Sequence, residues 1–272
     1  MTSGASKTAL QGIYDAAIRN REVRAWKRRQ RPSICLYDGD WTFRGQVVGE
    51  YSASFDWKLN DTGAGQIVLP YDHHLALWVM SFWKRGTSNV HVRVDKDGER
   101  WTGRLSEVVT EQNEDGERVT TLNFLHDHLP VWANPLTPAF VQFPKTFLMA
   151  GPSAYILKLT LFLNLVRLNM SLWQLPDDPL SFSGWTQGLN YKEWPVLVKP
   201  GSLILDDSQW TIINSRFKNF HDLAEPILAD GHLMVEMRRW FNGDPQPWPG
   251  AGLYRDGQLI IDFVDNSGWF DE

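Results

Sequence analysis

The chain has 272 residues, of which 43% are hydrophobic and 22% are charged, a composition typical of a globular protein that buries a sizeable core. Its formal net charge of −5 excludes a chain-wide electrostatic attraction to nucleic acid. The single cysteine, Cys35, excludes an intramolecular disulfide and fits assembly in a reducing cytoplasm.

No membrane association is expected. The N-terminus lacks the apolar segment of a signal peptide. The most apolar stretch, residues 155–170, contains Lys158 and Arg167 and is too short to span a bilayer.

The first predicted element is a helix over residues 6–30, which Pro32 ends. Apolar residues lie at helical spacing in its first half: Leu10, Ile13, Tyr14 and Ala17. Its second half is basic, and the candidate partner contacts there are Arg24, Lys27 and Arg28. The pattern indicates either an arm that docks on an acidic partner or nucleic acid, or a solvated helix face.

Residues 34–129 predict antiparallel strands. Three hairpin turns follow one another at Asp38-Gly39, Asp97-Gly98 and Asp115-Gly116. The stretch SFDWKLNDTGAGQIVLPYD, residues 54–72, adds a strand pair around a glycine-containing turn. Together they predict a meander or small barrel. Residues 72–84 break the period of two and predict a short helix that covers the sheet.

A cluster of prolines after Leu129 marks a boundary. Residues 153–171 then predict a helix with one water-facing polar stripe, made of Thr160, Asn164, Arg167 and Ser171. Residues 203–213 predict strands that return to the first sheet. Asn219 is expected to cap a helix that Gly231 ends, and residues 232–240 and 259–264 predict two further strands.

Two clusters resemble metal sites, His126-Asp127-His128 and Asp72-His73-His74. In a strand, His126 and His128 would face the same way and could bind one ion. No third ligand is predictable nearby, so loop histidines at the end of the meander are the preferred interpretation and no metal is expected.

The motifs of common enzymes and cofactor sites are missing. The sequence contains no Gly-x-Ser-x-Gly elbow, no phosphate-binding Gly-rich loop and no dinucleotide fingerprint. Cys35 lies in the middle of a predicted strand, where a core thiol is expected. The paired carboxylates Asp177-Asp178 and Asp206-Asp207 lie in turn-like sequence where Asp is common anyway. We therefore expect no catalytic residue and no cofactor.

Fourteen tryptophans are unusual for this length. Trp185, Trp194 and Trp248 lie among prolines and glycines, and this context predicts enough exposure to stack on sugars or partner chains. The alternative is that tryptophans pack the sheets and loops.

Four motifs, in this order, resemble one family. WKLNDTGAGQIVLPYD leads to RWTGRLSEVV, then to AYILKLTLFLNLVRLN followed by LWQLP, and then to FHDLAEPILADGHLMVEMRRW. Over most of residues 31–264 the chain resembles minor tail proteins of long-tailed phages that infect actinobacteria, the tail-tip baseplate hub family. A C-terminal part expected from that resemblance does not follow, which suggests a truncated chain.

The resemblance implies an α+β, mainly antiparallel fold that is tail-hub-like, with two β-barrel-type domains and a helical, loop-rich insert. The expected parts are an N-terminal basic arm, a first barrel, a Pro-rich helical insert, strands that return to the first barrel, and the start of a second β domain, at residues 1–31, 32–129, 130–202, 203–217 and 218–272.

The implied role is a homotrimeric, non-enzymatic virion component at the distal tail tip, acting in host attachment and DNA ejection. Its expected partners are the distal tail protein, the tape-measure protein and the central fibre or other minor tail proteins, without specific nucleic acid. Trp57, Asn60 and Asp61 are expected where the strand pair 54–72 joins a neighbouring subunit. The alternatives are a tail-associated cell-wall hydrolase and a carbohydrate-binding receptor module.

Overall fold

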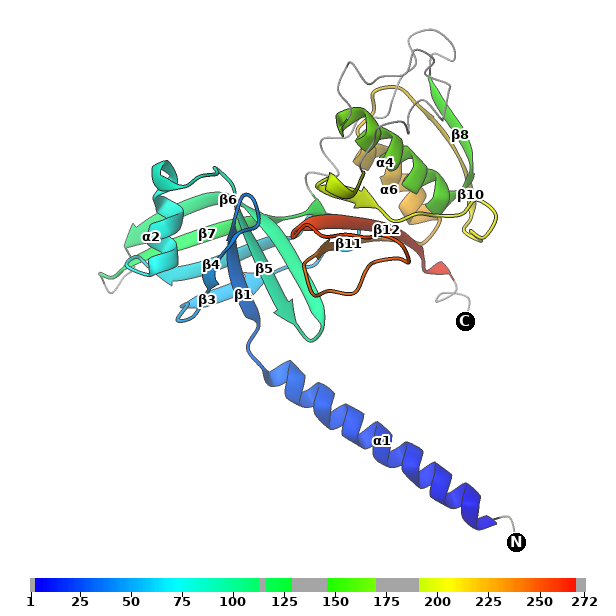
Figure 1. The fold of residues 1–272 in the computed structure, drawn as a ribbon, viewed down its shortest axis with the longest axis horizontal. Coiled ribbons are helices and arrows are strands. Elements are labelled where there is room, and N and C mark those ends of the chain that lie inside the picture. The colour runs from blue at the N-terminus through cyan, green and yellow to red at the C-terminus, as the bar shows by residue number, and fades with distance from the viewer. Residues whose placement is uncertain (1–2, 113–115, 129–145, 170–190, 268–272) are drawn as a thin grey trace.

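A computed structural model describes residues 3–112, 116–128, 146–169 and 191–267. Figure 1 shows a projecting N-terminal helix, a curled sheet and a second unit in which helices cover a smaller sheet. All strand pairs in these residues are antiparallel except one. The expected α+β, mainly antiparallel fold class is confirmed.

Helix α1 (Ser3–Arg29) extends away from the rest of the molecule (Figure 1). Its last turn is basic, and its apolar side chains face solvent: Leu10 is 63% exposed and Ile13 is 67% exposed. The predicted helix is therefore confirmed, but its exposed apolar side chains pack on no described part of its own chain.

The first unit is a seven-stranded antiparallel sheet with the order β2-β1-β5-β6-β7-β4-β3. Its strands are β1 (Ser33–Asp38), β2 (Phe43–Gln46), β3 (Ser52–Phe55), β4 (Ala64–Pro70), β5 (Val90–Lys96), β6 (Glu99–Gln112) and β7 (Arg118–His126). The hairpin predicted at Asp97-Gly98 is confirmed, and both residues have positive φ, as its tight turn requires. The strand pair predicted in residues 54–72 is confirmed as β3 and β4.

The core of this unit centres on Trp101, which is fully buried and donates its indole N–H to the Asp56 carbonyl at 3.1 Å. The predicted covering helix is α2 (His74–Met80), followed by the short helix η1 (Phe82–Lys84). Two glycines make room for the indole: a Cβ on Gly65 would lie 2.8 Å from the Trp101 ring, and one on Gly103 would lie 2.6 Å from it.

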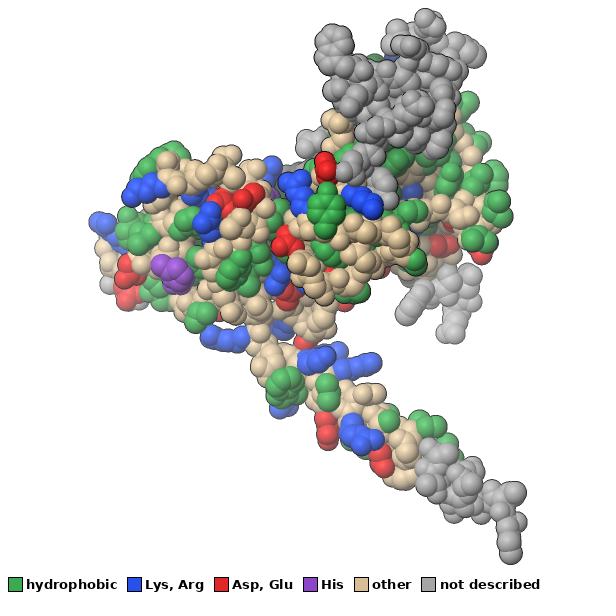
Figure 2. All heavy atoms as spheres, viewed as in Figure 1, with side chains coloured by type: hydrophobic (Ala, Val, Ile, Leu, Met, Phe, Trp, Pro, Cys, Tyr) green, Lys and Arg blue, Asp and Glu red, His purple; other side chains and the backbone are tan. Residues whose placement is uncertain are grey.

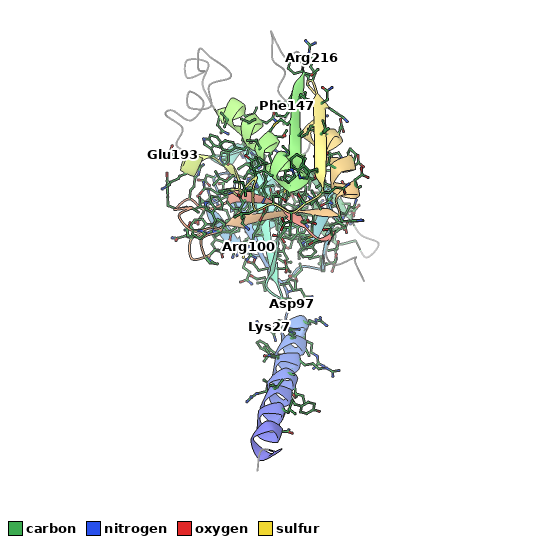
Figure 3. All side chains as sticks on the ribbon, turned by 90° about the vertical axis from the view of Figure 1, so that its right-hand side faces the viewer. Lys27, Asp97, Arg100, Phe147, Glu193 and Arg216 are labelled. Carbon is green, nitrogen blue, oxygen red and sulfur yellow. The ribbon has the colours of Figure 1, made fainter. Side chains whose placement is uncertain are left out.

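The second unit places α4 (Ser153–Asn169) and α6 (Phe220–Asp230) against the sheet β11-β12-β9. The strands are β9 (Val196–Val198), β11 (Leu233–Trp240) and β12 (Gln258–Asp265), and η3 (Tyr191–Glu193) precedes β9. A separate pair, β8 (Phe147–Pro152) and β10 (Trp210–Ser215), stands at the far side of this unit, with Phe147 and Arg216 at its tip (Figure 3). One hydrophobic core runs from Ala154 to Phe263.

The predicted return of residues 203–217 to the first sheet is wrong. Residues 203–205 form bends, and β10 pairs with β8 instead. β9, from the expected insert, joins the sheet of β11 and β12. Within the described ranges, the insert and the C-terminal segment therefore build one unit.

The predicted water-facing stripe of α4 is also wrong where the structure describes it. Thr160 is 0% exposed and Asn164 is 2% exposed, and the Asn164 side-chain amide donates to the Thr160 carbonyl at 2.8 Å. The helix contacts β8, β9, β10, β12 and α6, so little of its circumference remains for water. The side chains of Arg167 and Ser171 lie outside the described residues. Of the helices that are described, none is long and apolar enough to cross a membrane.

The close approach at Gly103 predicts a sharp packing requirement. We expect Gly103→Ala to lower the free energy of unfolding by about 2 kcal/mol, because the new Cβ would also lie 2.6 Å from the Leu125 carbonyl oxygen. Gly86→Ala is the matched control: nothing lies within 4 Å of its Cβ position, so a change within about 0.5 kcal/mol is expected. Urea unfolding measures both, and equal effects would contradict this account.

Candidate functional site

The two units meet along a seam between strand β11 and the first sheet. At one end of the seam, Asn60 lies in the β3–β4 turn with a φ of 53°, a conformation that Asn tolerates better than most residues. Its side-chain amide donates to the Leu233 carbonyl at 2.8 Å and accepts from the Val235 N–H at 2.9 Å. The amide therefore pairs with the edge of β11 as a neighbouring peptide group would.

The centre of the seam is a buried ion pair. Arg239 of β11 donates two hydrogen bonds to Asp127, at 2.6 and 2.7 Å, and Thr102 donates a third at 2.5 Å. Asp127 is 2% exposed and Arg239 is 7% exposed. The remaining Arg239 nitrogen donates to the Gly257 carbonyl at 2.5 Å. Burial alone would raise the pKa of the Asp127 carboxyl, but Arg239 and these hydrogen bonds outweigh it and hold that pKa below its ordinary value.

A second arginine closes the other end of the seam. Arg100, labelled in Figure 3, donates to the Arg239 carbonyl at 3.0 Å and to the carboxylates of Asp244 and Asp95 at 2.5 and 2.8 Å. Burial raises the pKa of Asp244, and the contacts with Arg100 and the Phe241 N–H more than reverse that effect. Arg93 Nε lies 2.8 Å from Asp95 as well, so two arginines face two carboxylates at this end.

Aromatic rings cover the buried pair. The Trp41 indole stacks on the His91 ring with centroids 4.3 Å apart, and the Arg239 guanidinium lies 4.4 Å from the Trp41 ring centroid. Phe241 packs against Tyr37 and Trp41 with centroids 5.5 Å apart in both cases. A buried, covered guanidinium of this kind gains from the cation–π contact.

The histidine cluster serves the seam and does not have the geometry of a metal centre. Burial lowers the pKa of His126 to about 4 and lowers that of His128. The His128 Nδ1 lies 2.6 Å from the Asp61 carbonyl, and the His128 N–H donates to His126 Nδ1 at 3.3 Å. Both Nδ1 atoms are therefore bonded to backbone groups. In the part of the chain that is described, no three His, Cys, Asp or Glu side chains are placed to hold an ion.

The basic candidates lie on α1, away from the seam. Arg24, Lys27 and Arg28 are all exposed, and Figure 3 shows Lys27 on the part of α1 nearest the body. They are free to meet a partner, and the structure itself assigns them none.

The candidates of the β3–β4 turn divide into two groups. Trp57 is 54% exposed, and the Asp61 carboxylate is exposed beside Lys58 at 4.0 Å. Asn60 is half-buried and contacts β11 of its own chain, so its side chain joins two units of one molecule.

The described tryptophan candidates are less exposed than the sequence predicts. Trp194 is only 7% exposed and packs near Phe162 with centroids 6.1 Å apart, so its predicted exposure is wrong. Trp248 is half-buried against the same core. Trp185 lies outside the described residues. The surrounding prolines therefore mark packed loops here.

The carboxylates considered for hydrolysis have structural contacts where they are described. Asp206 accepts a hydrogen bond from the Tyr155 N–H at 2.7 Å, at the start of α4. Asp207 is exposed, and Asp177-Asp178 lies outside the described residues.

An apolar surface escaped the sequence interpretation. On the outer face of β8 and β10, Leu148, Trp210 and Ile212 are 59%, 72% and 74% exposed. Figure 2 shows hydrophobic side chains along the edge of the second unit where these strands lie in Figure 1. In β10, Ile213 is buried and its neighbours are exposed, but the adjacent Ile212 and Ile213 are the same residue type, so the sequence carries no signal for this surface.

Comparison with known proteins gives a consistent result. The profile of the family described as "Siphovirus ReqiPepy6 Gp37-like protein" matches residues 33–269. The minor tail protein Gp28 of Mycobacterium phage L5 is 37% identical over 99% of this chain and 49% of its own length. Gp28 of Mycobacterium phage D29 is 36% identical over 92% of this chain and 46% of its own. The chain thus spans about half the length of these curated relatives.

Two solved structures are more distant. A tail protein from Neisseria meningitidis MC58 gives a TM-score of 0.39 at 13% identity, covering 88% of this chain and 52% of that one. A Francisella PdpA-VgrG complex gives 0.36 at 10% identity, covering 100% of this chain and 39% of that one. TM-scores this low indicate structures too different from this chain to support a structural inference.

The buried ion pair should dominate the stability of the seam. We expect Asp127→Asn to lower the free energy of unfolding by about 3–5 kcal/mol, because Arg239 would remain buried without its counter-charge. Asp61→Asn is the matched control at an exposed pair and should change stability by less than about 1 kcal/mol. Chemical denaturation measures both, and a mild effect at Asp127 would contradict the assignment.

Acid should weaken the same seam. Burial lowers the pKa of His91 and of His126 to about 4, below the 6.5 of an unfolded chain. Between these values the unfolded state binds more protons, so stability should fall as the pH decreases from about 6.5 to about 4. Each histidine contributes about 3 kcal/mol to the fall.

Urea unfolding between pH 7 and pH 4.5 measures this loss. Replacing both residues with Gln should reduce the slope of the profile in that range, and His128, whose pKa is also lowered, should account for part of the slope that remains. An unchanged slope in the double variant would contradict the assignment.

Proposed function

The chain belongs to the Siphovirus ReqiPepy6 Gp37-like family, and from this premise we propose that it is a structural part of the phage tail, located at the distal tip as the baseplate hub. The family match, with two mycobacteriophage minor tail proteins among the relatives, confirms the predicted resemblance to minor tail proteins of long-tailed phages of actinobacteria. Because those relatives are named as minor tail proteins, we propose a non-enzymatic role.

The exposed apolar side chains of helix α1 are the observation that best supports a role in assembly. It has 27 residues, so it extends about 40 Å, and its apolar side chains pack on no described part of its own chain. An isolated helix in water is only marginally stable, and most helices gain their stability from a packed apolar face. A partner that covers α1 would supply that face.

The residues along one face of α1 indicate the chemistry of the partner surface. Residues 10, 14, 17, 21, 24 and 28 are spaced by four and three, so they share one face. Leu10, Tyr14 and Ala17 make its first half apolar, while its second half consists of arginines. This pattern fits an apolar groove that continues into an acidic patch.

A second copy of α1 and DNA are both less suitable partners for this stripe than an acidic protein surface. Copies of α1 packed in parallel along the stripe would place like charges against each other, which is unfavourable. In a tail lumen, positive charge would slow passing DNA through phosphate attraction. An acidic neighbouring tail protein is therefore the preferred partner.

The proposed hub acts mechanically. Three copies form a ring, and their two β-rich units per chain give it six-fold character that adapts the tail tube to a three-fold central fibre. Cyclic assemblies of this kind join different patches that close by rotation. The ring closes the tube, contacts the distal tail and tape-measure proteins, and opens when host attachment is signalled. The exposed face of β8 and β10 is the second candidate contact.

Immunogold electron microscopy tests the location. Polyclonal antibody to this chain should label only the distal tail tip of particles from a producing lysate. Grains along fibres would indicate receptor binding, which is the carbohydrate-module alternative. Bare particles with soluble antigen would refute the tail role, and activity on purified cell wall would then favour a hydrolase.

Charge reversal tests the α1 contact within the same experiment. Replacing Arg24, Lys27 and Arg28 with Glu should reduce incorporation into particles about tenfold or more, because the acidic neighbour would be repelled. Reversal of three exposed cations of the first unit, Lys84, Lys96 and Arg118, is the matched control and should leave incorporation unchanged. Normal tails from the α1 variant would refute this contact.

A further inference from the structure

We propose that the seam holds a binding site for a short extended segment of another tail protein, which would add as a strand to the open middle of β11. The identity of the partner as a tail protein rests on the proposed function. The binding site itself rests on the geometry of the edge of β11 and of the groove beside it.

Strand β11 is an edge strand. In the order β11-β12-β9 it pairs only with β12, in a regular antiparallel register from Leu233 to Trp240. In such a pair, the backbone groups of alternate residues point away from the partner strand. The Leu233 carbonyl and the Val235 N–H bond to Asn60, and the Arg239 carbonyl bonds to Arg100. The odd-numbered residues therefore present their backbone groups to the seam.

The chain covers both ends of this edge and leaves its middle open. Four outward backbone groups between the two caps have no partner in the described part of the chain: the Val235 carbonyl, the Met237 N–H and carbonyl, and the Arg239 N–H. These four groups match the hydrogen-bonding capacity of a peptide of three to four residues. Adding a strand to an exposed edge is an established way in which proteins bind extended peptides.

A groove lies beside this open stretch. Its volume is about 530 Å³, and residues 56–60 line it opposite residues 234–238. Glu99 and Arg100 contribute to its lining, together with His126 and His128. Apolar side chains from both walls, Trp57, Leu59 and Met237, would contact alternate side chains of a bound strand.

The shape of the groove favours a single segment over a folded sheet edge. It has walls on two sides, formed by the β3–β4 turn and by β11, and Asn60 and Arg100 bond to β11 at either end of the open stretch. A folded edge would bring a second strand and its side chains into the same space. A lone extended segment needs only the width of one strand.

Two long described loops of the second unit do not suit the role of occupant. Residues 203–205 are bent, and Asp206 anchors their loop to α4. In the loop after β11, Gln246 bonds to both backbone groups of Leu253. A segment from a different protein is therefore the better source than a second copy.

Photo-crosslinking in producing cells tests the site. A benzophenone amino acid at Glu236, in the groove, should capture one discrete segment of another virion protein. The same group at exposed Tyr254, outside the lining of the groove, is the control and should not capture it. Crosslinks confined to this chain, to a second copy, or to a protein absent from purified particles would overturn the assignment.

A proline variant separates backbone pairing from side-chain contact. Met237→Pro removes the outward N–H without removing a bond to β12, and proline is tolerated at such edge positions. The crosslink should fall about tenfold with Met237→Pro and less than about twofold with Met237→Ala, which keeps the N–H. Equal yields in the two variants would overturn strand addition.

Hydrogen exchange on the wild-type chain keeps the test independent of variant folding. In the isolated protein, the Met237 amide should exchange faster than those of Glu236 and Arg238, which point toward β12. In purified tails it should become protected. Slow exchange in isolation, or no protection in tails, would overturn the proposal. Immunogold labelling reports separately on the tail location, so a failure of the proposed function is distinguishable.

Discussion

The buried pair of Asp127 and Arg239 is the constraint on which the relation between the two units depends. Removing two charges from water is costly, and the attraction between them offsets that cost only if every remaining donor and acceptor is satisfied. Here Thr102 donates a further hydrogen bond to the Asp127 carboxylate, and the Arg239 guanidinium donates a further one to the Gly257 carbonyl. A small displacement of either unit would break both hydrogen bonds between Arg239 and Asp127 at once. The main effect of the pair is therefore to select one relative position of the two units.

The rest of the seam follows from this position. Once Arg239 is fixed, its carbonyl lies within reach of Arg100, and the start of β11 lies against Asn60. The histidines at the end of β7 are then enclosed between the units, where burial disfavours their charged form. Two histidines that resemble metal ligands in the sequence thus become part of a packed boundary beside the Asp127–Arg239 ion pair.

The first unit was largely predictable, because local signals specify it. Alternation with a period of two and the Asp97-Gly98 turn fix a hairpin without knowledge of the rest of the fold. The second unit was less predictable, because its burial depends on distant segments: Thr160 and Asn164 look like a polar face until several elements surround α4. The same holds for the seam. His126-Asp127-His128 attracts notice in the sequence, but its partner Arg239 lies 112 residues away with no local signal that links them.

The two proposed contacts of this chain, the exposed stripe of α1 and the open stretch of β11, differ in kind. The exposed stripe of α1 lies on an arm that projects from the body, so any partner must approach from outside. The open stretch of β11 lies between two units that a buried ion pair holds in place. An uncovered edge strand invites non-specific pairing, and proteins usually cover or shorten such edges. Capping both ends of β11 with Asn60 and Arg100 shortens the open stretch to a few residues, too little for indiscriminate sheet extension. A stretch of this length still suits one specific segment, which suggests that a neighbouring chain covers it in the assembled state.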